Sequence, residues 1–250
     1  MTPLTGAADP AGISTPALRS SPKSRKRSLA GALADPRVRL GAGTGALLVT
    51  AIAVRRDRVG RCEAAAFRAV NGLSGWLYPP AWAVMQLGTL GAAPAAAGAA
   101  WLAGDRELAG RLLAGGTGTW ALSKVFKQMV RRPRPAALLP ETRIHGREAA
   151  GLGYLSGHAG VAVALGAAAF PHLGKTGRAV TLNLAPVVGL TRMYVGAHLP
   201  LDVAGGVALG FVVEATLALA RRPAAAPAVP TGPFGPRAAA LRPLAGRPVA

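Results

Sequence analysis

Cysteine, acidic side chains and aromatic side chains are all scarce in this chain. It has 250 residues, among them one cysteine (Cys62), 10 Asp and Glu together, and 5% Phe, Trp and Tyr. A single cysteine excludes an intrachain disulfide framework and a multi-cysteine zinc site. Charged residues make up 16% and apolar residues 51% of the chain, so the charge content is below that of ordinary soluble domains. Glycine and proline are frequent but follow no Gly-X-Y period, which excludes a collagen-like chain.

The charge that is present is mostly basic, and both ends of the chain carry a net positive charge. The chain carries 29 Lys and Arg and a formal net charge of +19. Residues 1–39 and 221–250 are basic and rich in Pro, Ala, Gly or Ser, with too few large apolar residues to pack a core, so we expect both to be disordered tails. Basic segments beside membrane spans are typically cytoplasmic and contact anionic lipid. No module of basic and aromatic residues accompanies this charge, which argues against nucleic acid as a partner.

Residues 40–220 contain uncharged stretches of about the length of a membrane span. A transmembrane helix needs roughly 20 apolar residues. We therefore expect an all-α, polytopic membrane bundle of about six transmembrane helices, with an interfacial helix at 62–76. The expected spans are 40–54, a second that begins at Pro79-Pro80 inside the uncharged stretch 69–104, 107–127, 156–170, 179–195 and 200–220. The stretch 40–54 also fits the apolar region of a signal peptide, but the long preceding tail makes this the weaker interpretation.

Six spans would place both tails in the cytoplasm of a multi-pass cell-membrane protein and leave three loops outside. Four arginines at positions 55, 56, 58 and 61 lie in the first outward loop and run against the charge rule. Glu214 falls near the cytoplasmic end of the last span, where we expect Arg221 or Arg222 to pair with it. Two GxxxG spacings, Gly41/Gly45 and Gly206/Gly210, would allow close helix contact.

Three polar clusters fall on the outward side of this expected topology. They are the segment from Lys127 through Arg132 to Arg134-Pro135, the triplet Ser156-Gly157-His158, and the set Arg192, His198 and Asp202. Each has a simpler interpretation: the basic flank of a membrane helix, a helix N-cap, a buried histidine, or an acid in a first helical turn. These simpler interpretations do not explain why all of these residues occur together at one membrane depth. Charged and ionisable side chains are energetically unfavourable there unless they bind an anion or pair with each other.

Together the clusters supply what phosphoryl transfer requires. Fixed cations bind a phosphoryl group and stabilise its charge, and a helix that begins with Ser-Gly offers free N–H groups to an anion. A histidine held by a carboxylate is a competent nucleophile toward phosphorus, which fits His198 with Asp202. His158 is placed to act as a general acid.

The order and spacing of the clusters resemble the type 2 phosphatidic acid phosphatase (PAP2) superfamily. Its signature reads Lys-x6-Arg-Pro, then Pro-Ser-Gly-His, then Ser-Arg-x5-His-x3-Asp. This chain has Lys127-x6-Arg134-Pro135, Leu155-Ser156-Gly157-His158 and Thr191-Arg192-x5-His198-x3-Asp202. The likeness spans roughly residues 60–220. Leu155 and Thr191 depart from the pattern, and neither change removes a catalytic group.

The resemblance implies a membrane phosphatase that needs no metal or other cofactor and whose active site faces outward. It implies that His198 is the nucleophile, that Asp202 orients it and that His158 protonates the leaving group. It also implies that the phosphoryl oxygens are held by Lys127, Arg134, Ser156, Gly157 and Arg192. The expected substrate is a lipid phosphate or diphosphate, for example phosphatidate, phosphatidylglycerophosphate or a polyprenyl phosphate.

Two alternatives remain open from the sequence. A soluble acid phosphatase or a vanadium-dependent haloperoxidase would share the same site, although the uncharged spans argue against both. A non-enzymatic membrane protein would instead bind anionic lipids or partners through its basic tails, and then His198 would be dispensable.

Overall fold

The computed structural model describes residues 35–55 and 58–221, and within those ranges it contains helices and no strands. The elements are α2 (Pro36–Ala53), α3 (Arg61–Asn71), η1 (Gly75–Leu77), α4 (Tyr78–Met85), η2 (Gln86–Gly88), α5 (Ala92–Leu102), α6 (Arg106–Val130), α7 (Pro135–Leu138), α8 (Gly157–Ala169), η3 (Phe170–His172), α9 (Lys175–Tyr194) and α10 (Pro200–Ala220). The predicted all-α class is confirmed. Helices α6, α8, α9 and α10 occur where the hydropathy predicts them and differ from the expected ranges by a few residues at their ends.

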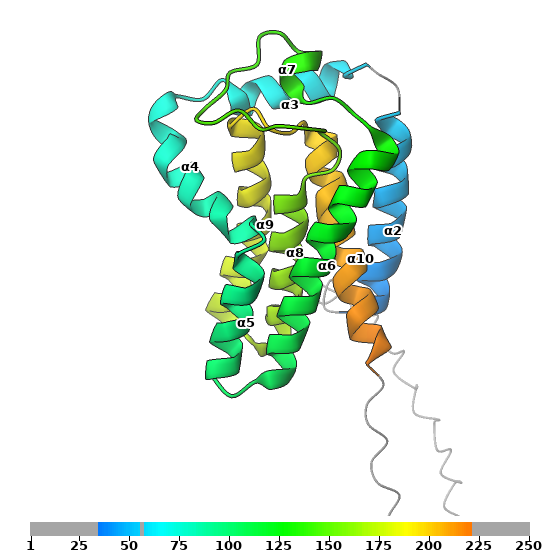
Figure 1. Cartoon of the computed structure of the whole chain (residues 1–250), viewed down its shortest axis with the longest axis vertical. Coiled ribbons are helices and arrows are strands. Elements are labelled where there is room, and N and C mark those ends of the chain that lie inside the picture. Colours follow the sequence, from blue (N-terminus) through cyan, green and yellow to red (C-terminus); the bar gives the residue numbers. More distant parts are fainter. Residues whose placement is uncertain (1–34, 56–57, 222–250) are drawn as a thin grey trace, which may run out of the picture.

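Helix α8 lies at the centre of the bundle. Its sequence, GHAGVAVALGAAA, is small and apolar on all sides, as is typical of a helix buried by its neighbours. It packs against α6, α9 and α10, while α2 packs along α10 and α5 along α6. These helices run along the long axis of the molecule, and α3 lies across one end of the bundle (Figure 1). Because of this packing, α8 begins, α6 ends and α10 begins at the end of the bundle that α3 covers (Figure 1).

The contact between α8 and α10 depends on glycine. A Cβ atom on Gly206 would lie 2.2 Å from the backbone oxygen of Ser156, and one on Gly210 would lie 2.4 Å from the backbone oxygen of Gly160. The predicted close contact at Gly206/Gly210 is therefore present. The corresponding prediction for Gly41/Gly45 was wrong, since a Cβ on either residue would meet nothing within 4 Å.

The second expected span is interrupted. α4 begins at Tyr78 with both prolines in its first turn, where a missing N–H costs nothing, and it ends at Met85. The 3₁₀ turn η2 and a short bend then separate it from α5. A Cβ on Gly88 would lie 2.3 Å from the backbone oxygen of His158, so η2 lies directly against the start of α8. A continuous helix was the wrong prediction for this segment, because an uncharged run does not mark where a helix turns to meet its neighbour.

The start of α2 corrects the predicted tail boundary at residue 39. Asp35 caps α2, since its carboxylate accepts the N–H of Arg37 at 2.9 Å, and the helix begins at Pro36. The rest of both predicted tails, residues 1–34 and 222–250, lies outside the described residues. Arg39 is 4% exposed because it packs into the bundle rather than extending from it.

Arg39 and Arg111 both pair with Glu214, and we call these three residues the Glu214 clasp. The clasp joins α2, α6 and α10. The predicted pairing of Glu214 with Arg221 was wrong: Arg221 pairs with Glu107, and Arg222 lies outside the described residues.

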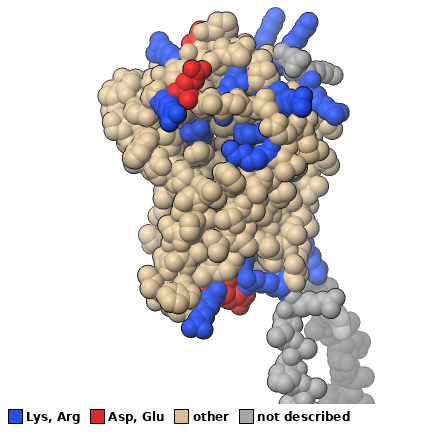
Figure 2. Space-filling view, in the orientation of Figure 1, with Lys and Arg blue, Asp and Glu red and all other residues tan. Residues whose placement is uncertain are grey.

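One face of the bundle has an uncharged band between two charged ends (Figure 2). Figure 2 shows Lys and Arg gathered at both ends of the bundle, with an uncharged band between them on this face. Large apolar side chains are exposed around the bundle, among them Leu48, Val49, Trp101, Leu113 and Val180. Within the described part of the chain, Pro200–Ala220 is the helix whose length and mean hydropathy suit a membrane crossing.

Candidate active site

Three segments that are distant in sequence converge at the end of the bundle below α3 (Figure 1). They are the C-terminal turn of α6 with the loop that follows it, the N-terminus of α8, and the turn from α9 into α10. The close contact of α8 with α10 fixes the last two, because the N–H of Ser156 donates to the backbone oxygen of Asp202 at 2.8 Å. All three sequence clusters therefore lie at one site.

His198 and Asp202 form the buried centre of this site. His198 lies in the turn before α10 and is 2% exposed, and its backbone N–H donates to the oxygen of Arg192 at 3.2 Å. Asp202 is fully buried in the first turn of α10, where its Oδ2 accepts the N–H of Leu199 at 2.8 Å. The same Oδ2 lies 3.8 Å from Nδ1 of His198, and Nδ1 has no hydrogen-bond partner among the described residues. The second ring nitrogen, Nε2, therefore points away from the carboxylate.

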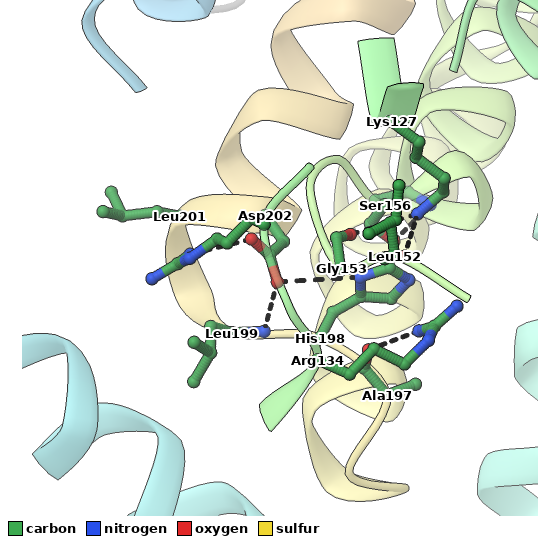
Figure 3. A network of polar contacts seen from close by, with 12 residues as sticks. Lys127, Arg134, Leu152, Gly153, Ser156, Ala197, His198, Leu199, Leu201 and Asp202 are labelled. Carbon is green, nitrogen blue, oxygen red and sulfur yellow. Dashed lines mark hydrogen bonds and ion pairs between the residues drawn. The ribbon is translucent and has the colours of Figure 1, made fainter. Parts of the chain in front are cut away.

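The surroundings of His198 favour its neutral form. Burial lowers the pKa of His198 well below its ordinary value, and the nearby positive charges of Lys127, Arg192 and Arg134 lower it further. A neutral imidazole keeps a lone pair on one nitrogen, so it can act as a nucleophile at physiological pH. Figure 3 shows the ring between Asp202 on one side and Lys127 and Arg134 on the other.

Backbone carbonyl groups hold two of the cations in place. Nζ of Lys127, on the last turn of α6, donates to the oxygens of Leu152 at 2.9 Å and Gly153 at 3.1 Å. Arg134 follows α6 and donates through Nη2 to Ala150 at 2.7 Å, and through Nη1 to Ala197, next to His198, at 2.6 Å. Neutral carbonyl partners orient these side chains without forming an ion pair, and the charge of Asp202 acts on both from a greater distance.

Arg192 completes the set of cations from the end of α9. It is 9% exposed, its Nη1 contacts Sδ of Met85 at 3.2 Å, and its Nε is buried without a hydrogen-bond partner among the described residues. A buried guanidinium with unused donors is suited to an anion that enters the site.

The N-terminus of α8 faces the same space. Ser156 is the N-cap and its Oγ accepts the N–H of Ala159, at 3.4 Å. A Cβ on Gly157 would lie 2.9 Å from Oγ of Ser123, so α6 approaches closely here. His158 lies in the first turn, and Lys127, Arg192 and Arg134 interact with it electrostatically. Among the described residues, no three His, Cys, Asp or Glu side chains are grouped as ligands for a metal ion.

Comparison with known proteins agrees with this geometry. Residues 108–224, which contain every residue predicted for the site, match the family model of the PAP2 superfamily. This part of the chain belongs to the PAP2 superfamily.

Two solved structures share the fold. The crystal structure of LpxE from Aquifex aeolicus is 21% identical with a TM-score of 0.56, covering 62% of this chain and 93% of that chain. The first transmembrane PAP2-type phosphatidylglycerolphosphate phosphatase from Bacillus subtilis is also 21% identical, with a TM-score of 0.55, covering 72% and 94%. No curated protein matches the chain.

The two departures from the PAP2 signature have structural roles. Leu155 is fully buried in an apolar cluster with Tyr154 and Leu209, so it packs the base of the site. Thr191 donates its hydroxyl proton to the backbone oxygen of Val188 at 2.8 Å, one turn earlier in α9.

Arg132, a member of the first polar cluster, was expected among the cations that face a phosphoryl group, and this expectation was wrong. Arg132 is 4% exposed and its guanidinium binds two carboxylates, those of Asp202 and Glu63. Glu63 lies in the first turn of α3, about 70 residues earlier in the chain. The sequence carries no signal for this pairing, because an acid in a first helical turn is explained by the helix dipole alone.

Proposed function

We propose that the chain is a membrane phosphatase that hydrolyses a lipid phosphate or diphosphate through a phosphohistidine on His198. One observation carries the proposal: a buried imidazole, kept neutral by its surroundings, lies beside a buried carboxylate and is flanked by cations that form no ion pair among the described residues. The match to the PAP2 superfamily and a structural neighbour described as a PAP2-type phosphatidylglycerolphosphate phosphatase support the same reaction class.

In the first step Nε2 of His198 attacks the phosphorus and the bond to the lipid oxygen breaks. Nδ1 carries the proton and faces Asp202, whose negative charge stabilises the imidazole as it becomes cationic. His158 gives its proton to the leaving oxygen. In the second step water attacks the phosphohistidine, His158 accepts a proton from that water, and inorganic phosphate leaves.

Lys127, Arg134 and Arg192 hold the phosphoryl oxygens, together with the Ser156 side chain and the N–H of Gly157. A pair of unit charges at 4 Å interacts by about 4 kcal/mol at an effective dielectric constant of about 20, compared with about 1 kcal/mol in water. Removing one such preorganised donor typically costs about 10²–10³ in kcat. Fixed cations of this kind supply charge stabilisation at the position where the transition state needs it.

The bundle suits a membrane, with the site at one surface. The uncharged lateral band and helix α10 support embedding. α2 begins and α10 ends at the end of the bundle opposite the site (Figure 1), so both basic ends would lie in the cytoplasm and the site outside. A lipid substrate can then keep its tail in the bilayer while its head group enters between the helix ends.

The test is phosphate release by the purified full-length protein in detergent micelles. The lipid panel contains phosphatidate, phosphatidylglycerophosphate, a polyprenyl diphosphate and a phosphorylated prenyl sugar. We expect release from at least one lipid, inhibition by vanadate, activity that survives EDTA, and loss of about 10³-fold or more in His198→Ala. His172→Ala is the matched control, since His172 pairs with Asp105 at 2.9 Å outside the site.

Two results would overturn the proposal: no release from any lipid, or equal activity of His198→Ala and the unmodified protein. Truncation after Arg222 separates the remaining alternative. A protein that acts through its basic tails loses function on truncation and keeps it in His198→Ala, whereas a phosphatase shows the reverse.

A further inference from the structure

A guanidinium group joins two carboxylates directly behind the His198–Asp202 pair. Nη1 of Arg132 donates to Oδ1 of Asp202 at 2.8 Å and to Oε1 of Glu63 at 3.0 Å, and Nη2 donates to Oε2 of Glu63 at 2.8 Å. All three side chains are at least nine-tenths buried. Figure 3 shows the carboxylate of Asp202 between a guanidinium on one side and the His198 ring on the other.

The backbone fixes every member of this group. The oxygen of Arg132 accepts the N–H of Gly153 at 2.7 Å, and a Cβ on Gly153 would lie 2.6 Å from the oxygen of Pro133, so glycine permits this approach. Oε1 of Glu63 also accepts the N–H of Leu201 at 3.1 Å, at the start of α10. The guanidinium of Arg132 thus bridges α3 and α10, and its three hydrogen bonds to Glu63 and Asp202 fix its orientation.

This arrangement determines where the carboxylate of Asp202 points. Arg132 occupies Oδ1, so Oδ2 is turned to the N–H of Leu199 and to Nδ1 of His198. Arg132 alone would also neutralise the charge that His198 needs. Glu63 offsets this effect, because Glu63, Arg132 and Asp202 together carry a net charge of −1.

We propose that Glu63 and Arg132 are positioning residues for phosphoryl transfer: Arg132 orients the carboxylate of Asp202 toward His198, and Glu63 preserves its net negative charge. The inference rests on the proposed function. Neither residue touches the substrate, so both act on the chemical step rather than on binding. Residues that orient the ligands of a metal ion from behind typically contribute about 10–100-fold to affinity or activity, and we expect an effect of this order here.

The experiment measures kcat, KM and thermal stability of Glu63→Gln and Arg132→Lys in the same micelles. Glu63→Gln keeps the size of the side chain and an oxygen for Leu201, and removes the charge. Arg132→Lys keeps the charge and loses the fork that reaches both carboxylates. The matched controls are Glu141→Gln and Arg68→Lys, which alter an exposed Arg–Glu pair at 2.7 Å that also involves α3.

We expect kcat to fall about 10–100-fold in both variants, with KM within about threefold of the unmodified value and slower formation of acid-labile phosphohistidine in a single turnover. The controls keep their kcat. Should Arg132→Lys fail to fold, the isosteric Glu63→Gln carries the test alone.

Three outcomes would overturn the inference. An unchanged kcat with lowered thermal stability makes the group a structural clamp. A raised KM with unchanged kcat makes it a binding element. Absence of activity in the unmodified protein on every lipid overturns the proposed function and this inference together, whereas an active protein with a normal Glu63→Gln overturns this inference alone.

Discussion

Replacing Asp202 with asparagine tests the central pair, because the change keeps the shape of the side chain and removes its charge. Oδ1 of Asp202 accepts from Arg132 and Oδ2 accepts from Leu199, both at 2.8 Å. An amide has one oxygen and one NH₂, so Asn cannot accept at both positions. Its NH₂ must face either the guanidinium or the N–H of Leu199 and the ring of His198.

Both orientations damage the reaction. With NH₂ toward His198, the amide donates to Nδ1 and holds the tautomer whose Nε2 carries the proton and cannot attack phosphorus. With NH₂ toward Arg132, a neutral amide oxygen faces Nδ1 of His198, and the negative charge that stabilises the cationic imidazole is lost. In a serine protease the equivalent Asp-to-Asn change lowers kcat by about 10⁴, so we expect a loss of about 10³–10⁴ here.

The loss of stability should be smaller than the loss of rate. Removing one member of a buried ion pair typically costs about 3–5 kcal/mol. Here Glu63 still pairs with Arg132 through two hydrogen bonds at 3.0 and 2.8 Å, so we expect the lower part of the range of about 1–3 kcal/mol for one lost buried hydrogen bond.

The assay compares Asp202→Asn with Asp105→Asn in phosphate release and thermal unfolding. Asp105 is a matched control, since it caps α6 by accepting the N–H of Leu108 at 2.8 Å and also pairs with a histidine, His172. Asn caps a helix about as well as Asp does, so this change should alter stability by less than about 1 kcal/mol and leave kcat unchanged. A folded Asp202→Asn with kcat within about tenfold of the unmodified protein would refute the assigned role of Asp202.

Two further predictions concern packing and pH. Gly206→Ala places a Cβ against the backbone oxygen of Ser156 and should separate α8 from α10, with a loss of about 1–3 kcal/mol in unfolding free energy and of most activity. Gly45→Ala meets no neighbour and should leave stability and activity intact. Equal behaviour of the two variants in thermal unfolding and phosphate release would contradict the close contact between α8 and α10. The lowered pKa of His198 means that the unfolded chain binds a proton there before the folded chain does, so this group's contribution to stability is full above about pH 6.5 and is lost as the pH falls toward the folded pKa. The stability advantage of the unmodified protein over His198→Gln should therefore shrink between pH 7 and pH 5 in thermal unfolding, and an advantage that grows on acidification would show that the folded state favours the charged imidazole.

Local patterns in the sequence predict much of the fold and the identity of the candidate site residues. α10 begins and ends where its proline and its following arginines indicate, and Lys127, Arg134 and His198 were selected by spacing. The break between α4 and α5 could not be predicted, because it depends on the contact of Gly88 with α8 rather than on a local signal.

Long-range pairings are the other part that sequence patterns do not reach. The partner of Arg132 lies on α3, and both partners of Glu214 lie on other helices. A buried acidic side chain requires a partner of opposite charge, but which of the 29 basic residues is that partner depends on how the helices pack. The predicted tails were selected by composition and lie largely outside the described residues.

The Glu214 clasp bears on how much of the chain is needed for an intact protein. Arg39 comes from α2, which precedes the family-matched residues 108–224. A fragment confined to that match would keep every residue of the signature, but the buried carboxylate of Glu214 would pair with Arg111 alone. The surface of α10 against which α2 packs would also be exposed. We therefore expect the smallest stable fragment of this chain to extend beyond the residues that match the family model.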